Sequence, residues 1–239
     1  MTLRRVGHKG ADHIAPGNTL ASFDAALAAR VDMIEFDVLP EDHLDPAGSR
    51  LVLAHDYEHV PPDALTLEQG LAHLASDAFA DTELDVDLKI PGYEARVLDA
   101  LRAHGLVERA IVSTLYMRSL ITLRELEPRL RLGWSVPRVK RDYTASALTV
   151  APAWALLVRM RRRLPEIAAG HVRAGRCDAV MAHWRLVTPR LVRELRAAGG
   201  DLYVWTVDDA RRIRTLEELG VTGVITNDPR LFEAAAVRR

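Results

Sequence analysis

The sequence predicts an α/β protein with the (β/α)8 architecture of a TIM barrel, and three observations support this. Eight short apolar runs alternate with segments of helical period. The length of 239 residues suits one barrel. Polar, chemically active residues fall at the C-terminal ends of the expected strands, where barrel enzymes place their sites. We therefore expect one domain spanning residues 1–239.

The expected strands are short and rich in branched apolar residues, and they cover residues 4–7, 33–38, 84–89, 110–113, 130–134, 179–182, 202–206 and 221–226. A further apolar run, 51–54, leads directly into His55. A doubly wound sheet would also alternate strands and helices. However, no Gly-x-Gly-x-x-Gly follows any of these strands, which favours the barrel.

The expected helices lie between these strands, at residues 19–30, 67–74, 93–104, 117–127, within 146–170, and at 189–198, 208–219 and 229–236. Either Asn18 or Thr19 is expected to cap the first of them. Pro128 ends the fourth helix, and Asp208 is a candidate cap for the seventh.

Composition excludes several classes of protein. The net charge is −1, so no overall field attracts nucleic acid or an anionic membrane. The single cysteine, Cys177, allows neither an internal disulfide nor a cysteine metal cluster. The first residues lead directly into a strand without a signal peptide, so a cytoplasmic location is the default expectation.

Two acids stand on one face of the second expected strand. Glu35 and Asp37 are two residues apart, so they share a face opposite Ile34 and Phe36. Neighbouring carboxylates repel each other unless a positive charge lies between them, and an oxygen-ligating cation commonly supplies it. The alternative is a pair of surface acids bonded to arginine.

The third expected strand repeats this pattern, with Asp85, Asp87 and Lys89 on one face. A strand with charges at alternate positions suits a polar site at a barrel mouth or an exposed edge. Together with Glu35 and Asp37, Asp87 completes a set of three carboxylates. Because only oxygen ligands are available, Mg²⁺ or Ca²⁺ is expected rather than zinc.

The order of short motifs along most of the chain resembles the glycerophosphodiester phosphodiesterase family, within the phospholipase C-like phosphodiesterase barrels. The motifs are His8-Lys9-Gly10, Pro16-Gly17-Asn18-Thr19-Leu20, Glu35-Phe36-Asp37, His55-Asp56, Asp87-Leu88-Lys89, Trp205-Thr206-Val207-Asp208 and 220–229. The resemblance implies metal-dependent hydrolysis of glycerophosphodiesters to sn-glycerol 3-phosphate and an alcohol, with small-molecule or lysolipid phosphodiesters as substrates.

Cleaving a phosphodiester requires charge neutralisation, a base for the nucleophile and an acid for the leaving oxygen. His8 and His55 are expected to be the acid and base, in an order that the sequence leaves open, because imidazole titrates near neutral pH. One divalent cation would be held by Glu35, Asp37 and Asp87.

Four further residues are candidates for binding phosphate or substrate. Lys9 and Lys89 can neutralise phosphate oxygens. Asn18 either contacts phosphate or metal, or only caps the first helix. Trp205 either stacks on the substrate or packs in the barrel.

The chain departs from the family pattern at three positions. Lys9 replaces the usual arginine, Gly17 the usual glutamate, and Asp87 the usual glutamate. The shorter acid at 87 is similar to the sphingomyelinase D or phospholipase D toxin branch, whose members form a cyclic phosphate. The segment from His55 to Asp87 is also short, so we expect a comparatively open site.

Two other functions remain open from the sequence. One is a phospholipase D-like enzyme that acts on lysophospholipids or sphingolipids and leaves a cyclic phosphate. The other is a noncatalytic barrel that binds phosphate esters.

Residues 148–163 join an apolar run to an arginine cluster, which is either a barrel helix with a basic end or a peripheral membrane patch. The run is too short for a transmembrane segment.

Overall fold

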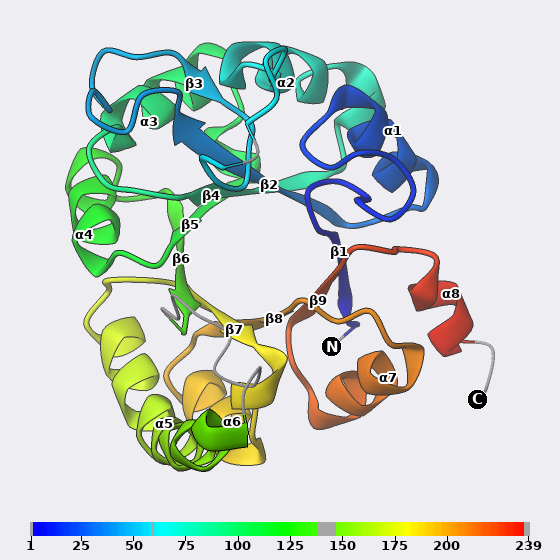
Figure 1. The fold of residues 1–239 in the computed structure, drawn as a ribbon, viewed down its shortest axis with the longest axis vertical. Helices are drawn as coiled ribbons and strands as arrows, with labels where there is room; N and C mark the ends of the chain where they lie inside the picture. Colours follow the sequence, from blue (N-terminus) through cyan, green and yellow to red (C-terminus); the bar gives the residue numbers. More distant parts are fainter. Residues whose placement is uncertain (1, 59, 138–146, 237–239) are drawn as a thin grey trace.

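A closed parallel barrel forms the body of the protein (Figure 1). The computed structural model describes residues 2–58, 60–137 and 147–236, and the side chains of 147–153 lie outside the description. Within these residues the barrel strands are β1 (Arg4–Gly7), β2 (Met33–Pro40), β4 (Glu83–Leu88), β5 (Ala110–Thr114), β6 (Arg131–Val136), β7 (Ala179–His183), β8 (Asp201–Trp205) and β9 (Gly223–Thr226). The barrel closes because β1 pairs with both β2 and β9. The predicted (β/α)8 fold is confirmed.

The apolar run at 51–54 lies outside the barrel wall. It contributes only β3 (Leu51–Val52), which pairs antiparallel with the end of β2. Leu53 N–H then donates to the Leu65 carbonyl at 2.7 Å, which ties the following segment down. This small extension holds His55 at the rim of the barrel.

The helices lie outside the strands (Figure 1). They are α1 (Leu20–Ala28), α2 (Leu67–Leu74), α3 (Glu94–Ala103), α4 (Met117–Leu126), α5 (Ala147–Arg173), α6 (Pro189–Ala197), α7 (Ala210–Leu219) and α8 (Leu231–Ala236). Short 3-10 turns occupy Asp77–Phe79, Val107–Arg109 and Trp184–Leu186.

The structure identifies the residues that cap α1 and α7. Thr19 caps α1, because its hydroxyl accepts from Ser22 N–H at 3.2 Å, and Asn18 is free for another role. The expected cap at Asp208 is wrong. Asp209 caps α7 by accepting from Arg212 N–H at 2.8 Å, while Asp208 turns toward the end of β9.

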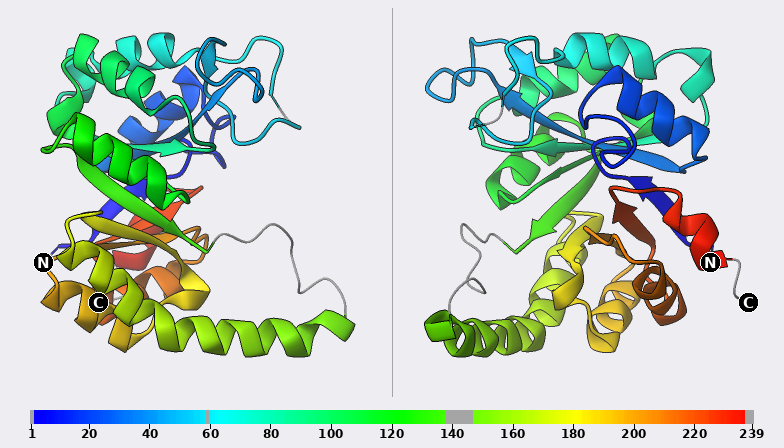
Figure 2. Two further views of the ribbon diagram at one scale, coloured as in Figure 1. Left: turned by 90° about the vertical axis from the view of Figure 1, so that its left-hand side faces the viewer. Right: turned by 45° about the vertical axis from the view of Figure 1, so that its right-hand side comes forward.

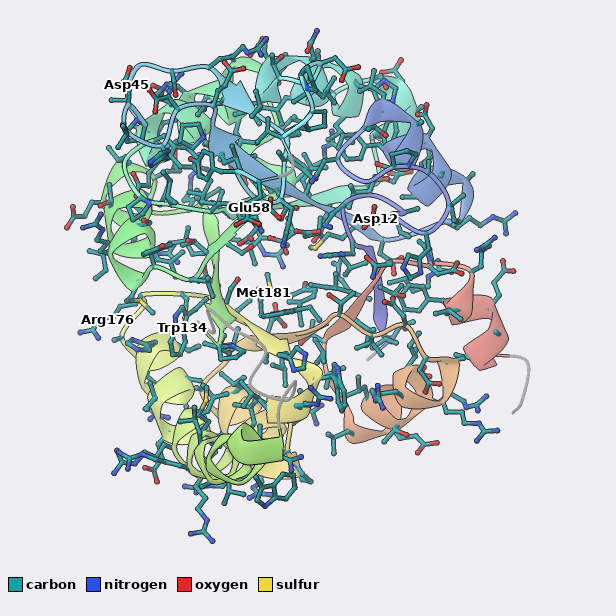
Figure 3. All side chains as sticks on the ribbon, in the orientation of Figure 1. Asp12, Asp45, Glu58, Trp134, Arg176 and Met181 are labelled. Carbon is teal, nitrogen blue, oxygen red and sulfur yellow. The ribbon has the colours of Figure 1, made fainter. Side chains whose placement is uncertain are left out.

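Apolar side chains fill the interior of the barrel. Met181 points toward the barrel axis (Figure 3), among the buried residues Val6, Met33, Ile111, Tyr203 and Ile225. At the N-terminal ends of the strands, Glu83 accepts from Arg131 at 2.8 Å and pairs with Arg4 at 2.9 Å. The predicted site residues lie at the opposite end of the barrel, where the strands have their C-terminal ends.

Helix α5 extends well beyond the barrel on the side toward which β6 points (Figure 2, left). Its C-terminal half packs on the barrel through buried Leu164 and Ala168. Farther out, Trp154 and Leu156 are 62% and 48% exposed. The side chains of 148–153 lie outside the described residues, so peripheral membrane contact by 148–163 stays a prediction. Across the described part of the chain, no helix combines the length and the apolar character needed to span a bilayer.

Candidate active site

Strand β2 supplies two acids to the barrel mouth. The predicted alternation is confirmed: Glu35 and Asp37 are buried in the barrel, whereas Ile34 and Phe36 belong to the core between strands and helices. In the parallel register, Asp37 lies beside Asp87 of β4. Asp37 and Asp87 are 50 positions apart in the sequence, but strand pairing places them side by side at one level of the barrel.

Glu35, Asp37 and Asp87 form a compact carboxylate cluster, with one oxygen of each within 4.8 Å of the others. The Lys89 ammonium lies between two of them. It contacts Asp37 Oδ1 closely and Asp87 Oδ2 at 2.6 Å. A cluster of three carboxylates with oxygen donors only fits a hard divalent cation such as Mg²⁺ or Ca²⁺. Lys89 is thus a partner of the carboxylates in addition to its predicted role toward phosphate.

Burial raises the pKa of all three acids, and contacts with Lys89 and His55 reverse this effect at Asp37. Burial, with a smaller contribution from Asp37, holds the pKa of Glu35 well above its ordinary value. Burial also raises the pKa of Asp87. Burial opposes ionisation of Asp37 as well, but the Lys89 ammonium and His55 hold its pKa well below the usual range. One lysine therefore does not neutralise the whole cluster, and a further cation is favoured there.

Asp85 lies one level deeper on β4, beside Glu35 in the register. It is only 1% exposed, and its Oδ1 has no hydrogen-bond partner among the described residues. Burial raises the pKa of Asp85 to about 7. A carboxyl that is neutral at pH 5 and charged at pH 8 costs stability when it ionises inside the fold.

We expect the metal-free protein to lose stability as pH rises from about 4 to 7, because folded Asp85 keeps a proton that the unfolded chain releases near its ordinary pKa. The full effect is up to about 4 kcal/mol. Asp85→Asn removes this dependence. In EDTA, urea unfolding should show that the variant's advantage over the wild type widens between pH 5 and pH 8. A difference that is the same at both pH values would contradict this expectation.

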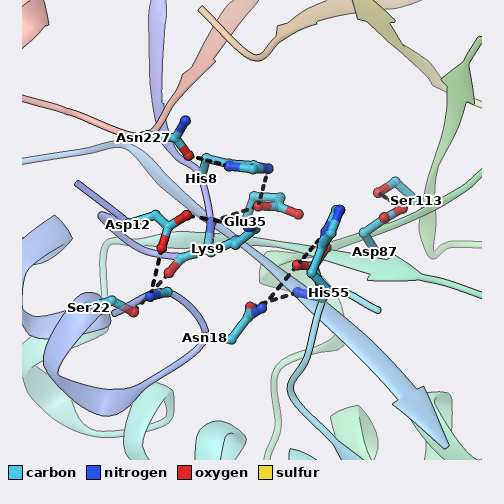
Figure 4. A network of polar contacts seen from close by, with 12 residues as sticks. His8, Lys9, Asp12, Asn18, Ser22, Glu35, His55, Asp87, Ser113 and Asn227 are labelled. Carbon is cyan, nitrogen blue, oxygen red and sulfur yellow. Dashed lines mark hydrogen bonds and ion pairs between the residues drawn. The ribbon is translucent and has the colours of Figure 1, made fainter. Parts of the chain in front are cut away.

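His8 follows β1 and is held from both its backbone and its ring. Its backbone N–H donates to the Thr226 carbonyl at 2.8 Å. Its ring Nδ1 lies 2.6 Å from Asn227 Oδ1 (Figure 4). Its Nε2 faces the carboxylate cluster, 3.8 Å from Glu35 Oε2. Burial lowers the pKa of His8, which favours the neutral imidazole.

His55 approaches the same cluster from the segment after β3. Its Nδ1 lies 3.1 Å from Asp37 Oδ2, and its side chain is 53% exposed. Asp56 follows His55, and its Oδ1 accepts from Glu58 N–H at 3.0 Å, as in a turn. The predicted pair of histidines therefore meets at the carboxylates from two different elements.

Asn18 contacts the site directly. Its Nδ2 donates to Asp37 Oδ2 at 3.0 Å, and its Oδ1 accepts from the Asp37 backbone N–H at 3.0 Å. Its φ of 59° is in the left-handed region, which asparagine tolerates better than most residues. Asn18 therefore does not cap α1 but holds the Asp37 carboxylate, a role that the sequence did not predict, and its contact with phosphate or metal stays a prediction.

Asp12 links Lys9 and Gly17 in a small loop beside the cluster. Lys9 N–H donates to Glu35 Oε2 at 2.8 Å, while its ammonium lies 3.3 Å from Asp12 Oδ2. Asp12 Oδ1 accepts from Gly17 N–H at 2.9 Å. A Cβ at Gly17 would approach Asp12 Oδ1 to 2.6 Å, so Asp12 occupies the space that a larger residue at 17 would need.

A cavity of about 380 Å³ opens beside His55 and the loop that contains Lys9, Asp12 and Gly17. Its lining includes the polar residues Lys9, Asn18 and His55 and the apolar residues Leu20, Leu53 and Leu65. A substrate in this cavity would therefore meet both polar and apolar side chains. That the site is more open than in relatives stays a prediction.

Trp205 lies across the barrel mouth, on β8. Its Nε1 donates to the Met181 carbonyl at 2.8 Å, and its ring packs edge-on against His183 at 5.3 Å between centroids. The ring is only partly buried. Packing in the barrel is therefore established for Trp205, and contact with substrate stays a prediction.

Sequence reasoning gave no site role to three residues that the structure brings to the cluster. Ser113 donates to Asp87 Oδ1 at 3.2 Å. Asn227 contacts His8, and Asp208 contacts Asn227. Each lies at or just after the C-terminal end of a predicted strand, which was the available signal.

Comparison with known proteins shows the family of the chain. The sequence profile of the glycerophosphoryl diester phosphodiesterase family matches residues 8–39 and 73–231. A glycerophosphodiester phosphodiesterase from Caldanaerobacter subterraneus is 22% identical over 260 residues, covering 94% of this chain and 93% of the relative. The matched segments exclude residues 40–72, so the assignment of His55 depends on the structure.

Solved structures show the same fold. A glycerophosphodiester phosphodiesterase from Agrobacterium tumefaciens has a TM-score of 0.70 at 20% identity, covering 99% of this chain and 100% of the other. A phosphodiesterase from Oleispira antarctica in complex with the product sn-glycerol-3-phosphate has a TM-score of 0.68 at 19% identity, covering 98% and 97%. With a profile match over most of its length, the chain belongs to the glycerophosphoryl diester phosphodiesterase family and is a phosphoric diester hydrolase.

Proposed function

We propose that the protein hydrolyses glycerophosphodiesters to sn-glycerol 3-phosphate and an alcohol, using His8 and His55 as the acid–base pair. The observation that carries the proposal is the convergence of both imidazoles on one carboxylate cluster at the barrel mouth. The product bound to the Oleispira antarctica relative supports the choice of substrate class.

Glu35, Asp37 and Asp87 would hold one divalent cation, Mg²⁺ or Ca²⁺. Bound there, the cation would supply positive charge to the nonbridging phosphate oxygens. Asn18 fixes the Asp37 carboxylate from the side, and Lys89 limits the repulsion between Asp37 and Asp87.

The two histidines would divide the proton transfers. One imidazole accepts a proton from the attacking hydroxyl of water or of the substrate as the new P–O bond forms. The other donates a proton to the alcohol oxygen as the old P–O bond breaks. If the substrate hydroxyl attacks, the product of this step is a cyclic phosphate, and a water molecule then opens it to the linear monoester. Lys9 stands beside the 380 Å³ cavity, where its ammonium can reach a phosphate oxygen.

We expect the purified protein to release glycerol phosphate from at least one of glycerophosphocholine, glycerophosphoethanolamine, glycerophosphoglycerol and glycerophosphoinositol. EDTA should stop turnover, and excess Mg²⁺ or Ca²⁺ should restore it. Phosphorus NMR identifies the product, and a coupled assay with sn-glycerol-3-phosphate dehydrogenase identifies its enantiomer.

Two results would contradict the proposal. Absence of turnover on all four diesters with cation present would reject the substrate class. A cyclic phosphate formed from a lysophospholipid, with no linear monoester, would instead support the phospholipase D-like alternative.

A further inference from the structure

A chain of polar contacts leads from His8 away from the carboxylates. Asn227 follows β9, and Asp208 lies in the segment between β8 and α7. Asp208 Oδ2 accepts from Asn227 Nδ2 at 2.7 Å. Asp208 Oδ1 accepts from the Asn227 backbone N–H at 2.8 Å and from the Thr226 hydroxyl at 2.9 Å. Asp208 is thus held by three donors.

These contacts determine which way the Asn227 amide points. An ionised carboxylate only accepts hydrogen bonds, so the atom of Asn227 that faces Asp208 must be the NH₂ group. The amide oxygen then faces His8, where it lies 2.6 Å from Nδ1. Because an amide oxygen also only accepts, Nδ1 of His8 must carry the proton.

We propose that Asp208 and Asn227 are positioning residues that hold His8 in the Nδ1–H tautomer and so present its Nε2 lone pair to the reacting phosphodiester. The inference rests on the proposed function for its catalytic consequence, but not for the tautomer itself. His55 has its own partner, the Asp37 carboxylate, so Asp208 acts on one histidine of the pair only.

The matching of donors and acceptors predicts the effect of two substitutions. In Asp208→Asn, residue 208 can donate as well as accept, so the Asn227 amide is no longer held in one orientation. Its NH₂ group can then face His8 Nδ1, which favours the Nε2–H tautomer. In the exchanged double variant Asp208→Asn/Asn227→Asp, residue 227 again offers His8 an acceptor and residue 208 again pairs with it. The exchange also keeps the net charge.

The test combines a spectroscopic readout with kinetics on the full-length protein in excess Mg²⁺. Long-range ¹H–¹⁵N correlation of ¹⁵N-histidine-labelled protein reports which ring nitrogen of His8 is protonated, with His8→Gln used to assign the signals. Asp228→Asn is the matched control, because Asp228 pairs with Arg230 at 2.7 Å instead of contacting Asn227 through its side chain.

The wild type and the control should show the Nδ1–H tautomer. In Asp208→Asn, we expect a loss of that signature and a fall in kcat of at least about tenfold with little change in KM. The exchanged variant should recover both the tautomer and most of kcat.

Two outcomes would overturn the inference. One is an Nε2–H tautomer in the wild type. The other is a loss of kcat in Asp208→Asn with the His8 tautomer unchanged, which would give Asp208 a merely structural role. If the wild type turns over no diester at all, the proposed function fails, while the tautomer measurement still decides this assignment.

Discussion

Asp87→Ala is expected to abolish both cation binding and turnover while the barrel stays folded. The variant loses one of three carboxylates whose oxygens lie within 4.8 Å of one another. Charge stabilisation by a bound cation contributes several kcal/mol to phosphoryl transfer, so the rate should fall by about a thousandfold or more. Lys89 keeps its contact with Asp37, which limits damage to the fold.

The measurement is thermal unfolding with and without Mg²⁺ or Ca²⁺. The wild type should gain stability with cation because a ligand that binds only the folded state stabilises it. Asp87→Ala should not respond. Asp99→Ala is a suitable control, because Asp99 is a 73%-exposed acid on α3. Equal stabilisation of the wild type and Asp87→Ala would place the cation elsewhere.

Replacing either histidine should remove catalysis and leave cation binding intact. We expect His8→Ala and His55→Ala to lower kcat by about 10²- to 10⁴-fold, the usual contribution of a general acid or base. Neither side chain belongs to the cluster of cation ligands, so cation-induced stabilisation should persist in both. This response separates the two variants from Asp87→Ala.

His73→Ala provides the control, because His73 pairs with Asp24 at 2.7 Å between α2 and α1, on the outside of the barrel. The result for His55 is the more informative one. It lies in the stretch 40–72 that the family profile does not match, so its role depends on its 3.1 Å approach to Asp37. Full turnover in His55→Ala would remove it from the mechanism and require another proton donor or acceptor.

Local patterns along the chain were sufficient to predict the barrel. Buried strands between amphipathic helices leave few alternatives to a closed parallel sheet, and period-two alternation places Glu35 and Asp37 on the inner face. Helix ends were less well predicted: the sequence suggested Asp208 as the cap of α7, but the cap is Asp209. Adjacent acids both satisfy the rule for caps, and only the competing donors at the end of β9 distinguish them.

The sequence by itself determined the fold class, the strand faces and the set of acids and histidines at the barrel mouth, because these depend on short-range periodicity. Only the tertiary structure decided how those groups pair. Lys89 lies between Asp37 and Asp87, Asn18 contacts Asp37 instead of capping α1, and His8 meets Asn227 across 219 positions of sequence. Such pairings depend on strand register and on barrel closure, which bring the two ends of the chain side by side.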